Sequence, residues 1–267
     1  MPTSALCFIL TINRPLWAQV HTHKKIMAHR YFLTDINDNI ATVTDSEAVH
    51  LCRVMRIKSG DEVILCDNSG FDYRAAAKDI SEKLITFDVI EKTKNEAEPT
   101  KDLVVYMALP KSDKLEFIVQ KACELGARKL VPFVSEFCVA QKSKKEDSKK
   151  LRLAKISAEA AKQCGRSTPM EIGDTITFKQ LLGELKQNDI NLFFYEHADM
   201  PLNKVDFADK QTVGVIIGSE GGFSQKECQQ LAENGAVTIS LGKRILRCET
   251  AAVSAITLAM YNMGEME

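Results

Sequence analysis

The segment from Val213 to Ser224 constrains the fold of this chain more than any other. It reads Val-Gly-Val-Ile-Ile-Gly-Ser-Glu-Gly-Gly-Phe-Ser, an apolar run that passes directly into a glycine-rich loop. Continuous apolar runs of this kind are typical of parallel strands that are covered on both faces. Ser224 and Glu227 then form the Ser-x-x-Glu pattern of a capping box, which fixes where the next helix begins. The segment therefore predicts a strand, a loop and a helix of an α/β domain.

The alternation of strand, loop and helix runs through the second part of the chain. Helices are predicted where apolar residues recur at helical spacing and capping residues precede them. The predicted strands are residues 103–108, 129–134, 191–195, 212–217 and 237–241. The predicted helices run from Ser112–Asp113 to Gly126, over about 149–163, from Ser224 onward, and over about 249–261.

The first part of the chain shows a different pattern. Between residues 27 and 90, short β-rich runs are separated by turn sequences such as Asp67-Asn68-Ser69-Gly70, and this spacing favours a small barrel. One helix is predicted at residues 46–55. The polar stretch at 92–100 has no apolar periodicity and is interpreted as a linker. We therefore expect two domains, at residues 27–98 and 99–267.

Residues 1–26 are expected to be an upstream-start extension that is poorly ordered. Their apolar stretch, residues 5–10, is short and has no basic region before it. No cleavage site of small residues clearly follows, so the stretch does not fit a signal peptide. Met27 is followed at once by His-Arg-Tyr-Phe-Leu, which is interpreted as the opening of the first folded domain.

The amino-acid composition limits which partners and which location can be expected for the chain. Lys and Arg number 35 against 36 Asp and Glu, so affinity for nucleic acid must come from where the bases cluster. The 8 cysteines form no CxxC pair and no metal-ligand spacing, which predicts reduced thiols, a cytoplasmic location and no metal site. No apolar run approaches the roughly 20 residues that a membrane helix needs.

A second loop, about twenty residues after the first, is expected to share one pocket with it. It reads Leu-Gly-Lys-Arg-Ile-Leu-Arg from Leu241 to Arg247, with the apolar pair Ile245 and Leu246 between basic residues. Such a loop suits a backbone that binds a flat apolar ring while its arginines face outward. Ligands of open α/β sheets bind beyond the carboxyl ends of strands, and Tyr195-Glu196 at the end of a third strand would complete the wall. The alternative for Arg247 is an ordinary surface arginine at a helix start.

Taken together, these motifs resemble the SPOUT class of methyltransferases, and specifically its ribosomal RNA small-subunit methyltransferase E family. The residues that carry the resemblance are Gly218-Ser219-Glu220-Gly221-Gly222-Phe223, Leu241-Gly242, Ile245-Leu246-Arg247, Glu249-Thr250-Ala251, His29-Arg30-Tyr31-Phe32, Lys111 with Glu116 through Gly126, and Glu159-Ala160, Gln163-Cys164 and Arg166. The chain departs from the family at Ser219, where proline is more usual, and at Phe137, where the family tends to carry a basic residue.

The resemblance implies an N-terminal PUA-like β-barrel that binds RNA and a C-terminal α/β domain with a deep trefoil knot. It also implies a homodimer, and methylation of uridine N3 in 16S (small-subunit) ribosomal RNA with S-adenosylmethionine as methyl donor. The residues expected to bind this cofactor are Tyr195, Glu196, Ile217, Gly218, Glu220, Gly221, Gly222, Leu241, Gly242, Ile245, Leu246 and Arg247.

The implied reaction requires particular chemical groups in the site. Uridine N3 carries a proton on the Watson–Crick edge, so the base must be unpaired and lose that proton before it attacks. A positive group beside the developing uridinate would stabilise it. Arg247 is predicted for this role, with Glu249 or Thr250 orienting it or relaying the proton. Glu249 is equally explained as an acidic residue that favours a helix N-terminus.

A basic run between residues 142 and 166 is the predicted path of the RNA backbone. It contains nine basic residues against three acidic ones, although a solvated helix face explains such a run as readily. The residues expected to contact RNA are His29, Arg30, Arg53, Arg56, Lys111, Lys149, Arg152 and Arg166.

Three other functions fit parts of the pattern. A non-catalytic RNA-binding protein would share the barrel and the basic run. A dinucleotide-dependent oxidoreductase would use the glycine loop, but the chain lacks the Gly-x-Gly-x-x-Gly fingerprint at this position. The same methyl transfer to a different RNA or base is the nearest alternative.

Overall fold

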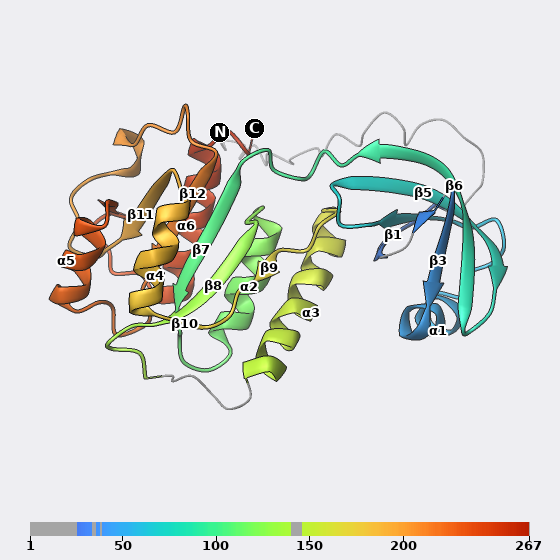
Figure 1. The fold of residues 1–267 in the computed structure, drawn as a ribbon, viewed down its shortest axis with the longest axis horizontal. Helices are drawn as coiled ribbons and strands as arrows, with labels where there is room; N and C mark the ends of the chain where they lie inside the picture. The colour runs from blue at the N-terminus through green and yellow to red at the C-terminus, as the bar shows by residue number, and fades with distance from the viewer. Residues whose placement is uncertain (1–25, 34–35, 38, 140–145, 267) are drawn as a thin grey trace, which may run out of the picture.

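The computed structural model describes residues 26–33, 36–37, 39–139 and 146–266. In this part of the chain, two domains lie side by side and are joined by one extended segment (Figure 1). We call them the barrel domain, residues 26–94, and the α/β domain, residues 102–266. The extension predicted at residues 1–26 lies outside the described residues, except for Ile26, which begins the first strand.

The barrel domain is a curved sheet of short strands. Its sheet has the order β1-β4-β5-β6-β3-β2; the β1–β4 pairing is parallel and the others are antiparallel. Alternate residues of β5, namely Tyr73, Ala75 and Ala77, are buried against the domain's own core. Its elements are β1 (Ile26–Phe32), β2 (Ile36–Asn37), β3 (Ile40–Thr44), α1 (Asp45–Arg53), β4 (Glu62–Cys66), β5 (Phe71–Ile80) and β6 (Leu84–Lys94).

The α/β domain is built on a parallel sheet. The strand order is β10-β8-β7-β12-β11-β13, with β9 beside β8. Its elements are β7 (Asp102–Ala108), α2 (Lys114–Glu124), β8 (Lys129–Val134), α3 (Glu146–Cys164), β9 (Glu171–Ile172), β10 (Ile176–Thr177), α4 (Phe178–Glu184), η2 (Leu185–Gln187), β11 (Ile190–Phe194), η3 (Leu202–Lys204), β12 (Thr212–Ile217), α5 (Gln225–Glu233), β13 (Ala236–Ile239) and α6 (Cys248–Asn262).

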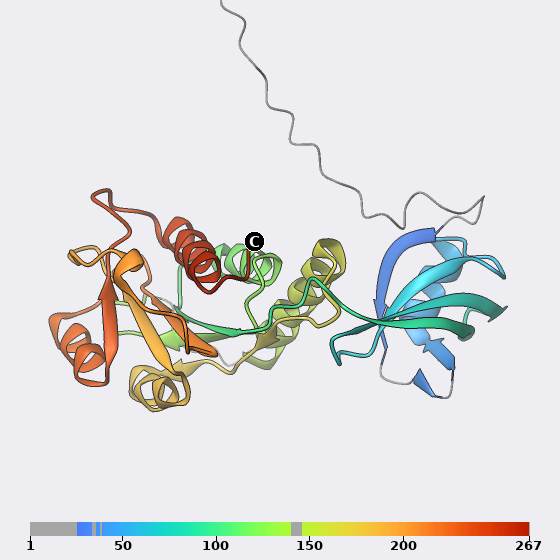
Figure 2. The same cartoon turned by 90° about the horizontal axis from the view of Figure 1, so that it is seen from above.

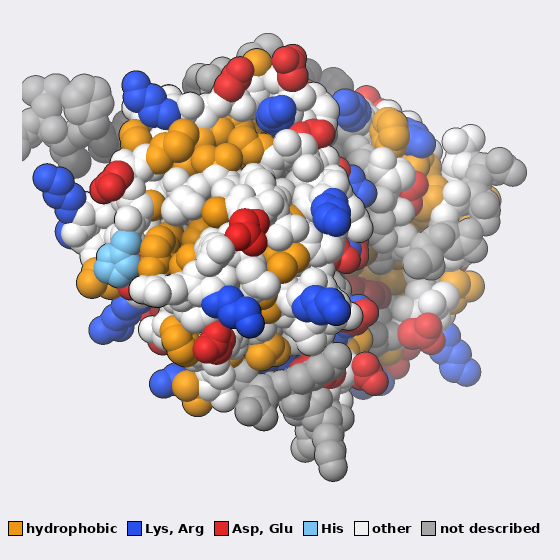
Figure 3. Space-filling model, turned by 60° about the vertical axis from the view of Figure 1, so that its left-hand side comes forward, with side chains coloured by type: hydrophobic (Ala, Val, Ile, Leu, Met, Phe, Trp, Pro, Cys, Tyr) orange, Lys and Arg blue, Asp and Glu red, His pale blue; other side chains and the backbone are white. Residues whose placement is uncertain are grey.

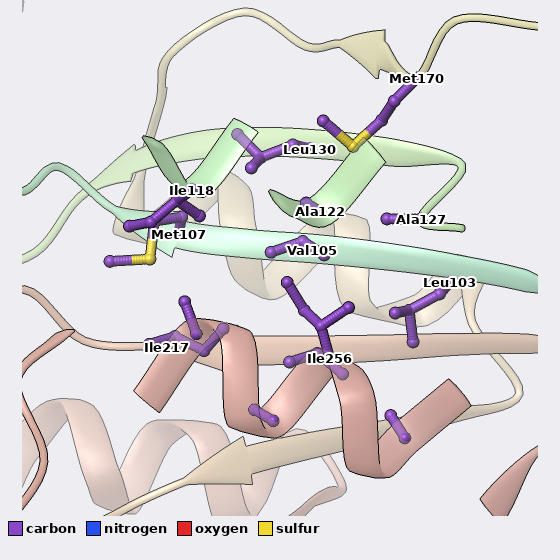
Figure 4. Close-up of a cluster of buried hydrophobic side chains, with 14 of the residues drawn as sticks. Leu103, Val105, Met107, Ile118, Ala122, Ala127, Leu130, Met170, Ile217 and Ile256 are labelled. Atoms are coloured by element: carbon purple, nitrogen blue, oxygen red, sulfur yellow. The ribbon is translucent and has the colours of Figure 1, made fainter. Parts of the chain in front are cut away.

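Helices cover both faces of this sheet, as its apolar strands require. Helices α2, α3 and α6 lie on one face, and α4 and α5 lie on the other (Figure 2). Val105 and Met107 of β7 pack on the first face against Ile118 of α2 and Ile256 of α6, and all four side chains are fully buried (Figure 4). Tyr106, between them, faces the second core. Burying each large side chain contributes roughly 1.5–3 kcal/mol, so the central strands are held from both sides.

The structure changes some of the predicted boundaries. Strands β8 and β12 coincide with the predicted strands, but β6 extends through Lys94, where residues 92–94 pair with β5. These residues are therefore strand and not linker. The short elements β9, β10 and α4 are absent from the prediction. Within the described residues, no helix combines the length and the hydropathy that crossing a bilayer requires.

Polar contacts hold the segment between the two domains, residues 95–101, and two arginines that were predicted to bind RNA take part in them. Arg166 is only 4% exposed, and its guanidinium donates to the carbonyls of Cys123 and Ala127 and to the carboxylate of Glu98. The prediction for Arg166 is wrong, because these buried acceptors occupy its donors.

Arg30 is the second arginine at this junction. Its side chain is 17% exposed and pairs with Asp72, which also accepts from Asn95. Asn95 donates in turn to the carbonyl of Gly165 in the α/β domain, 2.9 Å away. Arg30 therefore helps to hold the domain junction and is not a free phosphate ligand.

Candidate functional site

A cavity of about 480 Å³ opens at the carboxyl ends of β11, β12 and β13. Its walls come from the last residues of β11 and β12, from the residues after the three strands, from the first residue of α2 and from the first turn of α6. Beside it, Phe193 stacks on Tyr195 with ring centroids 5.4 Å apart and meets Phe223 edge-on with ring centroids 4.9 Å apart. The lining residues are Lys114, Phe194, Tyr195, Glu196, Ile217, Gly218, Ser219, Glu220, Gly221, Gly222, Phe223, Leu241, Gly242, Arg244, Ile245, Leu246, Arg247, Cys248 and Ala251.

The first loop, Gly218 to Phe223, is tightly packed. A Cβ added at Gly221 would lie 2.8 Å from both the Cβ and the carbonyl oxygen of Phe137, so only glycine fits there. Gly222 has a φ of 66°, and its N–H donates to the carbonyl of Ser219 at 3.0 Å. This loop is therefore fixed by backbone contacts.

The predicted capping box fixes the end of the same loop. Ser224 accepts from the N–H of Glu227, and the Glu227 carboxylate accepts from the N–H of Ser224 at 3.0 Å. The other oxygen of Glu227 accepts from the N–H of Glu136 at 2.8 Å. Because Glu227 is only 4% exposed, these bonds tie the segment after β8 to the start of α5.

Nothing in the sequence pattern singles out Lys114, yet it joins both loops. Its Nζ lies 2.9 Å from Glu220 and 3.1 Å from Glu249, and these hydrogen bonds raise the pKa of Lys114. Burial opposes ionisation of Glu220, but hydrogen bonds from Lys114 and from backbone N–H groups lower its pKa. The backbone N–H of Glu249, and then Lys114, lower the pKa of Glu249. All three groups are therefore ionised at neutral pH.

The second loop, Leu241 to Arg247, is open by comparison. Ile245 is 83% exposed, and Arg244 and Arg247 are exposed beside it. The N–H of Gly242 donates to the hydroxyl of Ser240 at 3.1 Å. Among the described residues, neither arginine has an ion-pair partner. The loop thus presents an apolar side chain and two free cations at the mouth of the cavity.

The structure brings together all the residues that were predicted to bind a cofactor, because each of them lines this one cavity. The predicted catalytic residues are more spread out. Arg247 lines the cavity, Glu249 lies beside it in the ion pair with Lys114, and Thr250 is exposed on the first turn of α6. Glu249 pairs with Lys114 and not with Arg247, which differs from the predicted orienting role.

The residues that were predicted to bind RNA fall into three groups where the structure describes their side chains. Arg53 and Arg152 are exposed but paired, with Glu82 and Glu116. Arg56, Lys111 and Lys149 are exposed, and no ion pair occupies them within the described residues. Arg30 and Arg166 are engaged at the domain junction, as described above. The side chain of His29 and the basic residues at 142, 144 and 145 lie outside the described residues.

The surface around the α/β domain is not uniformly charged. On the face that lies to the left in Figure 1, exposed hydrophobic side chains alternate with single charges of both signs (Figure 3). Binding of a polyanion to this face would therefore depend on a few individual cations.

Family models match most of the chain. The model of an RNA methyltransferase PUA domain matches residues 43–90, and the model of an RNA methyltransferase domain matches residues 96–260. Two relatives are named Ribosomal RNA small subunit methyltransferase E. The relative from Bacillus subtilis (strain 168) is 32% identical and the match covers 87% of this chain and 96% of the relative. The relative from Mesomycoplasma hyopneumoniae (strain 232) is 34% identical, with 86% and 97% covered.

Solved structures share the fold over nearly the same length. A hypothetical protein superimposes with a TM-score of 0.82 at 30% identity, covering 89% of this chain and 100% of that one. A ribosomal RNA small subunit methyltransferase E from Neisseria gonorrhoeae, bound to S-adenosyl methionine, superimposes with a TM-score of 0.79 at 24% identity, covering 87% and 97%.

Proposed function

The chain belongs to the ribosomal RNA small subunit methyltransferase E family of RNA methyltransferases, and from this membership we propose that it methylates N3 of one uridine in 16S ribosomal RNA, with S-adenosylmethionine as the methyl donor. One observation carries the proposal: the two loops after β12 and β13, which are separated in sequence by α5 and β13, line a single cavity. Ligands of open α/β sheets bind at this edge.

The lining residues suit S-adenosylmethionine in size and chemistry. A cavity of about 480 Å³ lies in the range of small-molecule sites. Leu241, Ile245 and Leu246 offer apolar contact to an adenine ring, while the carboxylates of Glu196 and Glu220 can accept from hydroxyl or ammonium groups. When bound, S-adenosylmethionine supplies an electrophilic methyl group on a sulfonium cation.

The chain's own residues must then handle the uridine. Arg247, exposed and without an ion-pair partner among the described residues, can place its guanidinium beside the negative charge that develops as N3 loses its proton. Glu249 is kept ionised by its backbone N–H and by Lys114, so this carboxylate is available as a proton acceptor or relay. Thr250 lies next to it and can orient the base through its hydroxyl.

RNA would be held by cations that the fold leaves free. Arg56 in the barrel domain and Lys111 and Lys149 in the α/β domain meet this condition. Such contacts position RNA without reading its sequence, and the target base must be unpaired to expose N3. Each neutralised phosphate should contribute a slope of roughly 0.7 to the fall of log affinity with log salt.

Three further features belong to this proposal. The α/β domain is a deep trefoil knot of the SPOUT type, which the position of β12 between β7 and β11 supports. The working form is a homodimer with each active site at the subunit interface, and the exposed Leu258 and Tyr261 on α6 support it. A ribosomal RNA substrate would be met in the cytoplasm.

Mass spectrometry of ribosomal RNA from a strain that lacks the gene tests the proposal. We expect one methyl group to be missing from one uridine of the small-subunit RNA and to return when the gene is restored. Loss of a methyl group from another RNA would keep the chemistry but change the substrate. If no methyl group is lost and the purified chain does not bind S-adenosylmethionine in a calorimetric titration, the chain is an RNA-binding protein without this activity.

A further inference from the structure

Phe137 is a large apolar side chain held at the edge of the site with almost half of its surface exposed. It follows β8 and is 47% exposed. Its Cβ and its carbonyl oxygen lie against the backbone of Gly221, whose loop lines the cavity. The contact with the loop is therefore made by atoms near the main chain, and the ring takes no part in it.

The segment that carries Phe137 is fixed on both sides. The N–H of Glu136 donates to the buried carboxylate of Glu227 at 2.8 Å. The Sγ of Cys138 lies 3.7 Å from the hydroxyl of Ser219 and 3.1 Å from that of Ser135. Ser219 of the glycine loop thus contacts the residue that follows Phe137. The ring of Phe137 is presented from a rigid backbone.

A cation without an ion-pair partner among the described residues, Lys111, follows β7 and contacts the same loop. The backbone N–H of Lys111 lies 3.2 and 3.3 Å from the two carboxylate oxygens of Glu220, the residue before Gly221. The Lys111 side chain is exposed, and no ion pair holds its ammonium group among the described residues. An exposed aromatic ring and a free ammonium group are therefore anchored to two consecutive residues of one loop.

We propose that Phe137 is a stacking platform for an unpaired RNA base beside the glycine loop of the cavity, with Lys111 binding a neighbouring phosphate. Aromatic rings and cations in this combination bind single-stranded nucleic acid, because every base has a π-face and every nucleotide a phosphate. The inference rests on the proposed function, since it assumes that RNA approaches this cavity.

The chemistry of the side chain makes the inference specific. Phenylalanine has no charge and can bind a nucleotide only through its ring, whereas a basic side chain would bind phosphate through charge. A contact through Phe137 should therefore depend on the presence of a base and not on the salt concentration.

The test compares two fluorescent probes of equal length on the purified full chain: single-stranded oligouridylate, and an abasic ribose–phosphate oligomer. Phe137→Ala keeps the Cβ and the carbonyl that touch Gly221, so the loop is retained. We expect this variant to bind oligouridylate roughly 5- to 100-fold more weakly, and to bind the abasic probe as the wild type does. Phe137→Leu should behave like Phe137→Ala, and Phe137→Trp like the wild type.

Salt dependence separates the two residues. Lys111→Ala should reduce the log–log salt slope by roughly 0.7 with both probes, whereas Phe137→Ala should leave the slope unchanged. Phe137→Arg should increase the slope by roughly 0.7 and abolish the preference for oligouridylate.

Several results would overturn the inference. They are equal binding of both probes by the wild type, unchanged binding of oligouridylate by Phe137→Ala, an equal loss for both probes in that variant, or a change in its sedimentation that marks Phe137 as a contact between protein chains. A wild-type chain that binds the oligouridylate through Phe137 but does not bind S-adenosylmethionine would instead refute the proposed function.

Discussion

The two loops of the cavity are built in opposite ways. Gly218 to Phe223 is held by the packing of Gly221 on Phe137, by the ion pair of Glu220 with Lys114 and by the capping box that follows. Leu241 to Arg247 has exposed cations and an isoleucine that is 83% exposed. One wall of the site is formed before any ligand arrives, and the other presents groups that still lack a partner.

This difference indicates that the two loops have different roles in ligand binding. A preformed wall lowers the entropy cost of binding and fixes the position of the ligand. An open wall can close over the ligand and complete the site only when it is filled. We therefore expect substitutions in the first loop to change affinity through shape, and substitutions in the second to change the reaction or the closure.

The largest effect is expected for Arg247→Ala. Loss of the positive group beside the developing uridinate should reduce the single-turnover rate of methyl transfer roughly 100- to 1000-fold, with a much smaller change in affinity for S-adenosylmethionine. Lys243→Ala, which removes an exposed cation of the same loop that does not line the cavity, is the matched control. A normal rate in Arg247→Ala would remove this residue from the mechanism.

Gly221→Ala should damage the preformed wall. The added Cβ would lie 2.8 Å from two atoms of Phe137, one of them a backbone oxygen, so the loop must shift. We expect affinity for S-adenosylmethionine, measured by calorimetry, to fall roughly 5- to 100-fold. Gly183→Ala on α4, where an added Cβ meets nothing within 4 Å, should bind normally. Wild-type affinity in Gly221→Ala would show that the first loop is not preformed.

Lys114→Met should leave two facing carboxylates without their shared cation. Affinity for S-adenosylmethionine should fall roughly 10-fold at neutral pH, and Lys114→Arg should restore most of it. In the wild type, the lowered pKa values of Glu220 and Glu249 mean that the ion pairs stabilise the site above the ordinary glutamate pKa. That stabilisation is lost only as the pH falls through the lowered values.

In the Lys114→Met variant, the affinity for S-adenosylmethionine should change with pH in the opposite direction. Without the lysine, the pKa of each carboxylate rises, so lowering the pH to about 5 protonates one of them and recovers part of the affinity. An affinity that is flat with pH, or that falls further toward about pH 5, would contradict the role given to Lys114.

The smallest effect is expected for Ile245→Ser. Because Ile245 is 83% exposed, the free energy of unfolding without ligand should change by no more than about 0.5 kcal/mol. Affinity for S-adenosylmethionine should still fall roughly 5-fold, since the side chain becomes buried when the loop closes. Thermal unfolding without the cofactor measures the change in stability, and thermal unfolding with the cofactor measures the change in affinity. If the variant and the wild type unfold alike under both conditions, the second loop has no role in binding.

Much of the α/β domain can be predicted from its sequence, because a strand that is buried on both faces leaves a continuous apolar run. β8 and β12 match their predictions residue for residue, and the capping box places α5. The two-residue strands β9 and β10 are too short to leave a pattern. The two loops of the cavity are predictable for a further reason: each directly follows a strand, and strand ends of a parallel sheet meet at one edge.

Side-chain partners are harder to predict. Lys114 is absent from the predicted site residues because it lies far from Glu220 and Glu249 in the sequence, so its ion pairs appear only once the chain has folded. The prediction that Arg166 binds RNA is wrong for the same reason. Its position in a basic run suggests an exposed cation, but two backbone carbonyls and Glu98 surround it in the folded chain. A count of basic residues along the sequence cannot distinguish an exposed arginine from one with buried partners.

Hydrogen–deuterium exchange, with and without S-adenosylmethionine, tests most directly that the two loops form one cofactor site. The amides of residues 241–247 should exchange rapidly in the free chain and become strongly protected when the cofactor is added. The amides of residues 218–223 should be protected in both states and change little. Exchange that is unaffected by the cofactor at residues 241–247, or protection confined to another part of the chain, would contradict the account.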